Sequence, residues 1–141
     1  MRSRSPAVLF GIAALLAPMA AIPGQTGQAQ QEPRYDTASV VNFSATVTDI
    51  REVPKGSPLS GLHLVVLEAD KETTVEVYVA PMQFLKELQI AYARGDRLQI
   101  AGSRVRFGSG TIVLAREVRR DVDTAYFRDE KGKPYWSGGP T

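Results

Sequence analysis

Residues 62–79, which read LHLVVLEADKETTVEVYV, are the stretch that decides the fold. Two aliphatic-rich runs, 62–69 and 73–79, flank the polar pair Asp70-Lys71. A two-residue turn at this pair matches every inward position with another aliphatic residue. The expected pairs are Leu62 with Val79, Leu64 with Val77 and Val66 with Val75. The stretch therefore predicts an antiparallel β-hairpin with one buried face.

The same register fixes the outer surface of this hairpin. It sets Val65 against Glu76 and His63 against Tyr78, on the side away from the aliphatic pairs. We interpret His63 as a surface side chain packed on Tyr78.

The segments on either side of the hairpin predict more strands and one helix. Residues 41–48 alternate apolar and polar, as a strand with one buried face requires, and the turn-rich run 54–61 forms a long loop after it. Pro81 is a good first helical residue, and apolar residues then recur at spacings of three and four up to Tyr92. We expect one short helix that ends near Gly95.

The second half of the chain returns to strand patterns. In 97–107 the pair Gly102-Ser103 predicts a bulge that resets the phase, and Ser109-Gly110 predicts a tight turn. That turn gives four expected pairs, two apolar and two outward: Phe107 with Ile112, Val105 with Leu114, Arg106 with Val113 and Arg104 with Ala115. Residues 124–136 predict a short C-terminal hairpin around a turn at 129–133, whose aromatic residues close one barrel end.

Three strands, a helix and two strands within about 80 residues follow the order of an OB-fold. The stretch GDRLQIAGSRV (95–105) resembles the fourth strand of many OB-folds, and GLHLVV (61–66) and RDEKGKPYW (128–136) resemble small exported bacterial OB-fold proteins. The resemblance implies an all-β domain with one short helix. Its expected architecture is a five-stranded OB-fold-like Greek-key barrel, with the helix between strands three and four and a short C-terminal hairpin.

The N-terminus has the parts of a secretory signal. Arg2 and Arg4 precede an apolar run at 7–17 and a small-residue region after Pro18. An anchor needs about 20 apolar residues, and this run stops sooner. We expect cleavage after Ala29 and a periplasmic or secreted protein without an integral membrane segment. The expected parts are a signal peptide at 1–29, a flexible leader at 30–38, the barrel at 39–136 and a tail at 137–141.

Composition argues against catalysis. The chain has no cysteine and one histidine, and it lacks a nucleophile-elbow or phosphate-cradling glycine motif. We expect neither an enzyme, nor a metal site, nor a cofactor. Loss of the signal peptide leaves 15 basic and 15 acidic residues, so the mature chain is neutral. Seven arginines against two acidic residues nevertheless make 94–120 locally basic.

These observations leave two classes of function open. The first is a binding module for an anionic polymer, either nucleic acid or glycan, that uses the usual OB-fold face and the arginine-rich strands. The second is a cell-envelope protein that docks on another protein through strand edges or the Tyr135-Trp136 tail. The candidate ligand-binding residues are His63, Tyr78, Arg104, Arg106, Arg119 and Arg120.

Overall fold

The computed structural model of the protein describes residues 32–136. The predicted signal peptide, the first two residues of the leader and the tail lie outside the described residues. Within 32–136, no helix has the length and apolar character that a membrane crossing needs. The elements are η2 Thr37–Ser39, β1 Val40–Val53, β2 Gly61–Glu68, β3 Thr74–Ala80, α2 Met82–Leu88, β4 Arg97–Phe107, β5 Gly110–Arg120 and β6 Asp123–Tyr126.

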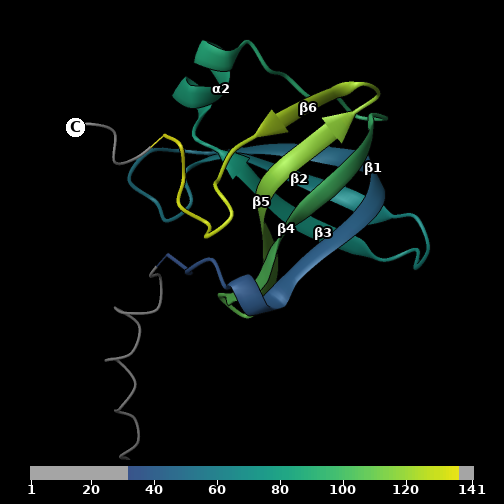
Figure 1. Ribbon diagram of the computed structural model, residues 1–141, viewed down its shortest axis with the longest axis horizontal. Helices are drawn as coiled ribbons and strands as arrows, with labels where there is room; N and C mark the ends of the chain where they lie inside the picture. The colour runs from purple at the N-terminus through teal and green to yellow at the C-terminus, as the bar shows by residue number, and fades with distance from the viewer. Residues whose placement is uncertain (1–31, 137–141) are drawn as a thin grey trace, which may run out of the picture. The chain divides into compact units, whose positions relative to one another are not determined.

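The strands form one sheet that closes on itself. Their order is β3-β2-β1-β4-β5-β6, and a parallel pairing of β3 with β5, at Val77–Val113 and Tyr78–Leu114, joins the two sides (Figure 1). The helix α2 lies between β3 and β4 in the chain. The expected five-stranded OB-fold-like barrel is therefore confirmed. The segment predicted as a C-terminal hairpin adds a sixth strand, β6, along the second half of β5.

The long strand β1 pairs with two neighbouring strands, β4 and β2. Residues 40–46 pair with β4, and residues 45–53 pair with β2 with a bulge between Val47 and Asp49. Alternation along β1 puts Phe43, Ala45 and Val47 inside, as predicted. They join a core drawn from β2, β3, β4, β5 and α2.

The predicted register of the β2–β3 hairpin is confirmed at four pairs. Leu64 lies opposite Val77, Val66 opposite Val75, and the outer pairs are also as expected. Leu62 departs from the prediction, because a bulge sets it opposite Ala80. The turn is also longer than two residues: the Glu68 N–H donates to the Thr73 carbonyl, which encloses residues 69–72.

The helix is shorter than predicted. It ends at Leu88, because Gln89 adopts a left-handed conformation and its N–H donates to the carbonyls of Leu85 and Lys86. Tyr92, expected on the helix, lies in the irregular segment before β4.

The predicted register of the β4–β5 hairpin was wrong by two positions. The turn is Gly108-Ser109, so Phe107 pairs with Gly110 and Val105 with Ile112. The bulge lies near Gly102 as expected, but the extra residue is Arg116 on β5, and β4 keeps its phase. Because β4 keeps its phase, the β5 residues opposite its positions 102 and 104, which are Ala115 and Val113, point into the main core and not outward.

The C-terminal hairpin is confirmed. Arg128 bridges Pro134, and the Tyr135 N–H donates to the Phe127 carbonyl. Of its aromatic residues, Phe127 is fully buried in the main core and Trp136 packs against it, whereas Tyr135 and the β6 residue Tyr126 are more than half exposed.

Candidate functional site

The outer face of β2 and β3 is covered, which corrects the interpretation of His63 and Tyr78 as surface residues. Only 2% of His63 and 3% of Tyr78 is exposed. Their side of the sheet carries a second apolar cluster with residues that are distant in sequence. Its members are Leu59, Tyr78, Ile112 and Leu114, with Tyr35, Val105, Phe107 and Trp136 packed against them.

His63 and Tyr78 are used to hold the loop between β1 and β2. The His63 Nε2 lies 2.7 Å from the Leu59 carbonyl oxygen, and its Nδ1 lies 2.8 Å from Oε2 of Glu76. Since a carbonyl can only accept, Nε2 carries hydrogen at this contact. The Tyr78 hydroxyl donates to the Ser60 carbonyl at 2.9 Å, and burial raises the pKa of this phenol. Neither polar group is left for a ligand.

Three segments make up this cover: residues 32–36, the loop 54–60 and the hairpin 127–136. The Leu59 N–H donates to the Glu32 carboxylate at 3.0 Å, so the N-terminal segment holds the loop. The Arg128 guanidinium lies 5.8 Å from the ring of Tyr35 and 5.2 Å from that of Trp136, which joins the first segment to the last. Burial lowers the pKa of Arg128. The part of the expected leader that the structure describes thus contacts the barrel.

The four candidate arginines do not form one patch, contrary to the sequence interpretation. Arg119 lies opposite Gln99, whereas Arg104 lies opposite Val113, five residues farther along β4. This separation is about 17 Å at the usual rise of a strand. Alternation also turns Arg104 and Arg106 to the opposite face from Gln99.

Arg120 is already engaged. Its Nη1 donates to Asp96 at 2.8 Å and to the Ala91 carbonyl at 2.9 Å, and its guanidinium lies 5.1 Å from the ring of Tyr92. Hydrogen bonds from the Ala93 N–H and from Arg120 lower the pKa of Asp96, and burial raises that of Tyr92 to about 12. Arg120 therefore fastens the segment before β4 to the end of β5.

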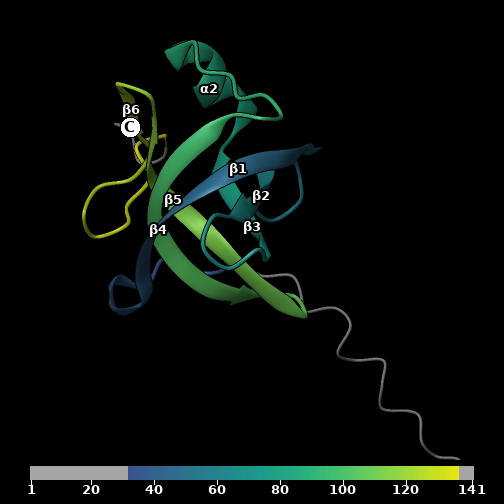
Figure 2. The same ribbon diagram turned by 90° about the vertical axis from the view of Figure 1, so that its right-hand side faces the viewer.

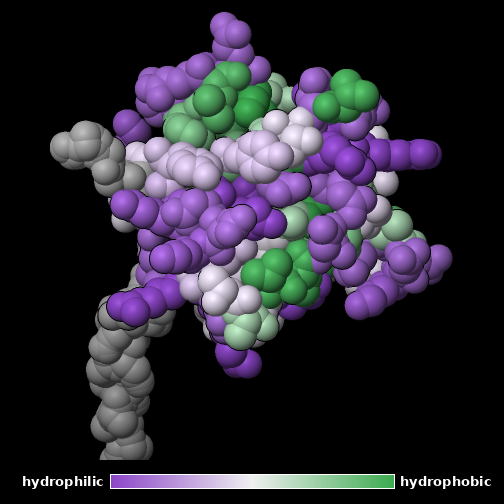
Figure 3. Space-filling view, in the orientation of Figure 1, coloured by the Kyte–Doolittle hydropathy of each residue, from purple (hydrophilic) through white to green (hydrophobic). Residues whose placement is uncertain are grey.

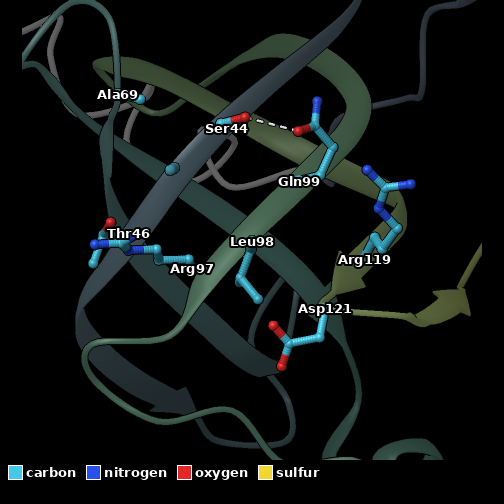
Figure 4. Close-up of a pocket in the computed structure, with 9 residues that line it drawn as sticks. Ser44, Thr46, Ala69, Arg97, Leu98, Gln99, Arg119 and Asp121 are labelled. Carbon is cyan, nitrogen blue, oxygen red and sulfur yellow. Dashed lines mark hydrogen bonds between the residues drawn. The ribbon is translucent and has the colours of Figure 1, made fainter.

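An open site lies on the outer face of β1, β4 and β5, beyond the cover. It is a hollow of about 500 Å³, here called the polar hollow (Figure 4). Its lining residues are Ser44, Ala45, Thr46, Ala69, Arg97, Leu98, Gln99, Arg119 and Asp121.

Side chains in the polar hollow form a row across three strands. Ser44 lies opposite Gln99, and Gln99 lies opposite Arg119. The Ser44 hydroxyl donates to Gln99 Oε1 at 2.7 Å, and the Gln99 amide donates to Asn42 at 2.6 Å. In Figure 4 the Gln99 amide and the Arg119 guanidinium lie toward the same end of the polar hollow, while the Asp121 carboxylate lies at its other end. The row offers fixed hydrogen-bonding groups beside a cation.

Two arginines of the polar hollow are free within the part of the chain that the structure describes. Arg97 and Arg119 are both exposed, and neither forms an ion pair or a side-chain hydrogen bond among residues 32–136. Of the candidate residues, only Arg119 lies here. Arg97, Gln99 and Ser44 were missed, although alternation along each strand marks them as outward. The sequence did not show that β1 pairs with β4, and this pairing is what brings Ser44 beside Gln99.

The lining of the polar hollow offers two guanidinium groups, one carboxylate, and hydroxyl and amide groups. None of the lining residues is a histidine or cysteine. Among residues 32–136, no group of three or more His, Cys, Asp or Glu side chains is placed to hold a metal ion.

The closed strand order and the short helix after β3 define the class as an OB-fold-like barrel. The chain belongs to the MamS/MamX magnetosome protein family, whose pattern it matches over residues 39–125. No curated protein matches it. Among solved structures, a chain of the S. pombe Stn1–Ten1 complex aligns with a TM-score of 0.46 at 15% identity, over 60% of this chain and 59% of that chain.

Proposed function

We propose that this protein is an exported, non-catalytic binding module that acts at the magnetosome and takes an anionic polymer in the polar hollow. The observation that carries the proposal is the pair of free arginines, Arg97 and Arg119, beside the hydrogen-bonded row on β1 and β4. The family supports the place of action, and the signal-like N-terminus supports export.

The charge of the hollow favours an anion. Its lining has two arginines and one acidic residue, Asp121. Guanidinium groups bind carboxylate, sulfate and phosphate through paired N–H donors. Arg119 lies in the row and Arg97 lies two residues from Gln99 along β4, so a ligand seated over the hollow would meet both positive charges.

The other polar side chains of the hollow favour an acidic glycan over nucleic acid. Nucleic-acid sites on OB-folds stack bases on aromatic rings, and no aromatic residue lines the hollow. Ser44, Thr46 and Gln99 instead offer donors and acceptors that suit a chain of hydroxyl groups. The aromatic pair that could have stacked on a base, His63 and Tyr78, lies under the cover.

The test is a titration of the purified full chain with a uronic-acid oligosaccharide, alongside single-stranded oligo-dT, at several salt concentrations. We expect the oligosaccharide to bind with an affinity that falls as salt rises. Arg97→Gln and Arg119→Gln should each weaken binding by about tenfold, the effect of one charge-assisted hydrogen bond.

The matched control is Lys55→Gln, which removes one positive charge from an exposed loop outside the hollow. Equal weakening by Lys55→Gln would mean that only net charge matters. Tighter binding of oligo-dT would move the ligand class to nucleic acid, and no binding of either probe at low salt would contradict the proposal.

A further inference from the structure

Among residues 32–136, β6 and the end of β4 each have an edge that no other strand pairs with. β6 pairs with β5 on one side only. On β4, the pairing with β1 stops at Ser103, so residues 104–107 pair only with β5. Free edges carry unpaired backbone N–H and C=O groups and are templates for another strand.

These two edges lie at opposite ends of the barrel. Figures 1 and 2 both show the β4–β5 hairpin reaching away from α2 and β6. One edge can therefore meet the other only on a separate molecule.

The two edges carry opposite charges without partners among the described residues. Arg104 and Arg106 form no ion pair on the β4 edge, and Asp121 and Asp123 form none at the β6 edge. The positive charge of the β4 edge and the negative charge of the β6 edge are therefore complementary.

Apolar side chains accompany these charges. Val122 is 91% exposed in the turn before β6, and Tyr126 is 55% exposed at its end. Figure 3 shows hydrophobic residues over α2 and at the turn before β6. On the other edge, Val105 and Phe107 are half-buried.

One antiparallel register matches a pair of opposite charges and a pair of apolar residues. If Asp123 lies opposite Arg106 of a second copy, Val122 lies opposite Phe107 and Thr124 opposite Val105. Opposite charges and apolar residues then face each other, the cross-strand pairs that stabilise a sheet. A shift by one residue separates both sets.

We propose that copies of this protein associate head to tail, with β6 of one copy adding to residues 104–107 of the next. Because the two surfaces differ, a pair of associated copies still has one free β6 edge and one free β4 edge, and the assembly grows as a chain or closes as a ring. With about four residues a side, the contact is smaller than a standard interface. We therefore expect reversible association that strengthens with concentration and weakens with salt.

The test is sedimentation velocity of the full chain from ~10 μM to ~1 mM, the range suited to a weak contact. The wild type should form species larger than a dimer as concentration rises. Arg106→Glu and Asp123→Arg each bring like charges together, and each should weaken association more than about tenfold. Both side chains are exposed, so the unfolding midpoint of each variant should stay that of the wild type.

The decisive measurement is sedimentation of an equimolar mixture of Arg106→Glu and Asp123→Arg. Each reversed edge then meets the reversed edge of the other variant, so association should return to near the wild-type level. The matched controls Lys55→Glu and Asp70→Arg make the same charge changes on exposed loops away from both edges, and they should associate like the wild type. A wild type that stays monomeric throughout, or a mixture that fails to recover, would overturn the proposal.

Discussion

The imidazole of His63 is held from two sides, by a backbone carbonyl of the β1–β2 loop and by a carboxylate of β3. Its ring centroid also lies 5.2 Å from that of Tyr78, in a tilted arrangement. A polar side chain this buried is costly to remove, because its partners lose their hydrogen bonds without regaining water. The residue expected to face solvent therefore contributes to stability.

We predict that His63→Ala lowers the free energy of unfolding by about 2–4 kcal/mol, from lost packing and from the unpaired Leu59 carbonyl. Urea denaturation of the two proteins measures the difference. Lys55→Ala, on the same loop but exposed, should change stability by less than about 0.5 kcal/mol. A His63→Ala loss as small as that would show that the cover does not depend on this residue.

At the scale of single elements, the two hairpins show what a sequence can predict. In β2 and β3 the aliphatic residues alternate with other types, so one register fits and the prediction succeeded at four pairs. In β5 four consecutive residues, 112–115, are all buried because both faces are covered, and alternation is lost. Gly108-Ser109-Gly110 also allows two turns. The polar hollow was missed for a related reason: its strands are adjacent only in the folded barrel.

Gly102 on β4 shows how closely two strands approach at the β5 bulge. A β-carbon there would lie 2.2 Å from the Leu114 carbonyl oxygen and 2.9 Å from Cα of Ala115. Both atoms are backbone, so neither can turn away. The close approach of the two strands therefore requires glycine at this position.

We predict that Gly102→Ala destabilises the barrel by about 2 kcal/mol or more, since an added methyl in a packed site forces the backbone to shift. The control is Gly110→Ala in the same hairpin, where a β-carbon meets no atom within 4 Å and φ is ordinary. Thermal unfolding of both variants compares them. Equal melting temperatures for Gly102→Ala and the wild type would contradict the close approach.

The net charge of the protein depends on whether the predicted signal peptide is removed. The full chain has a net charge of +2, and the part beyond residue 29 is neutral. If the predicted cleavage occurs, the overall charge gives a polyanion little attraction, and the proposed binding would depend on local arginines such as Arg97 and Arg119.

We predict that the protein recovered from the cell envelope begins at Gln30. Small residues at Gly27 and Ala29 suit a signal peptidase, and the basic and apolar regions precede them at the usual distances. Intact mass spectrometry measures the start of the chain. A mass equal to that of all 141 residues would contradict cleavage.

The cover over β2 and β3 lies mostly outside the part of the chain that defines the family. The family match spans residues 39–125, whereas Tyr35, Arg128 and Trp136 lie before and after it. The matched region builds the barrel and one segment of the cover, whereas the other two segments, 32–36 and 127–136, lie outside it. Changes in residues 32–36 or 127–136 should therefore alter the exposure of His63 and Tyr78 while leaving the strands of the barrel in place.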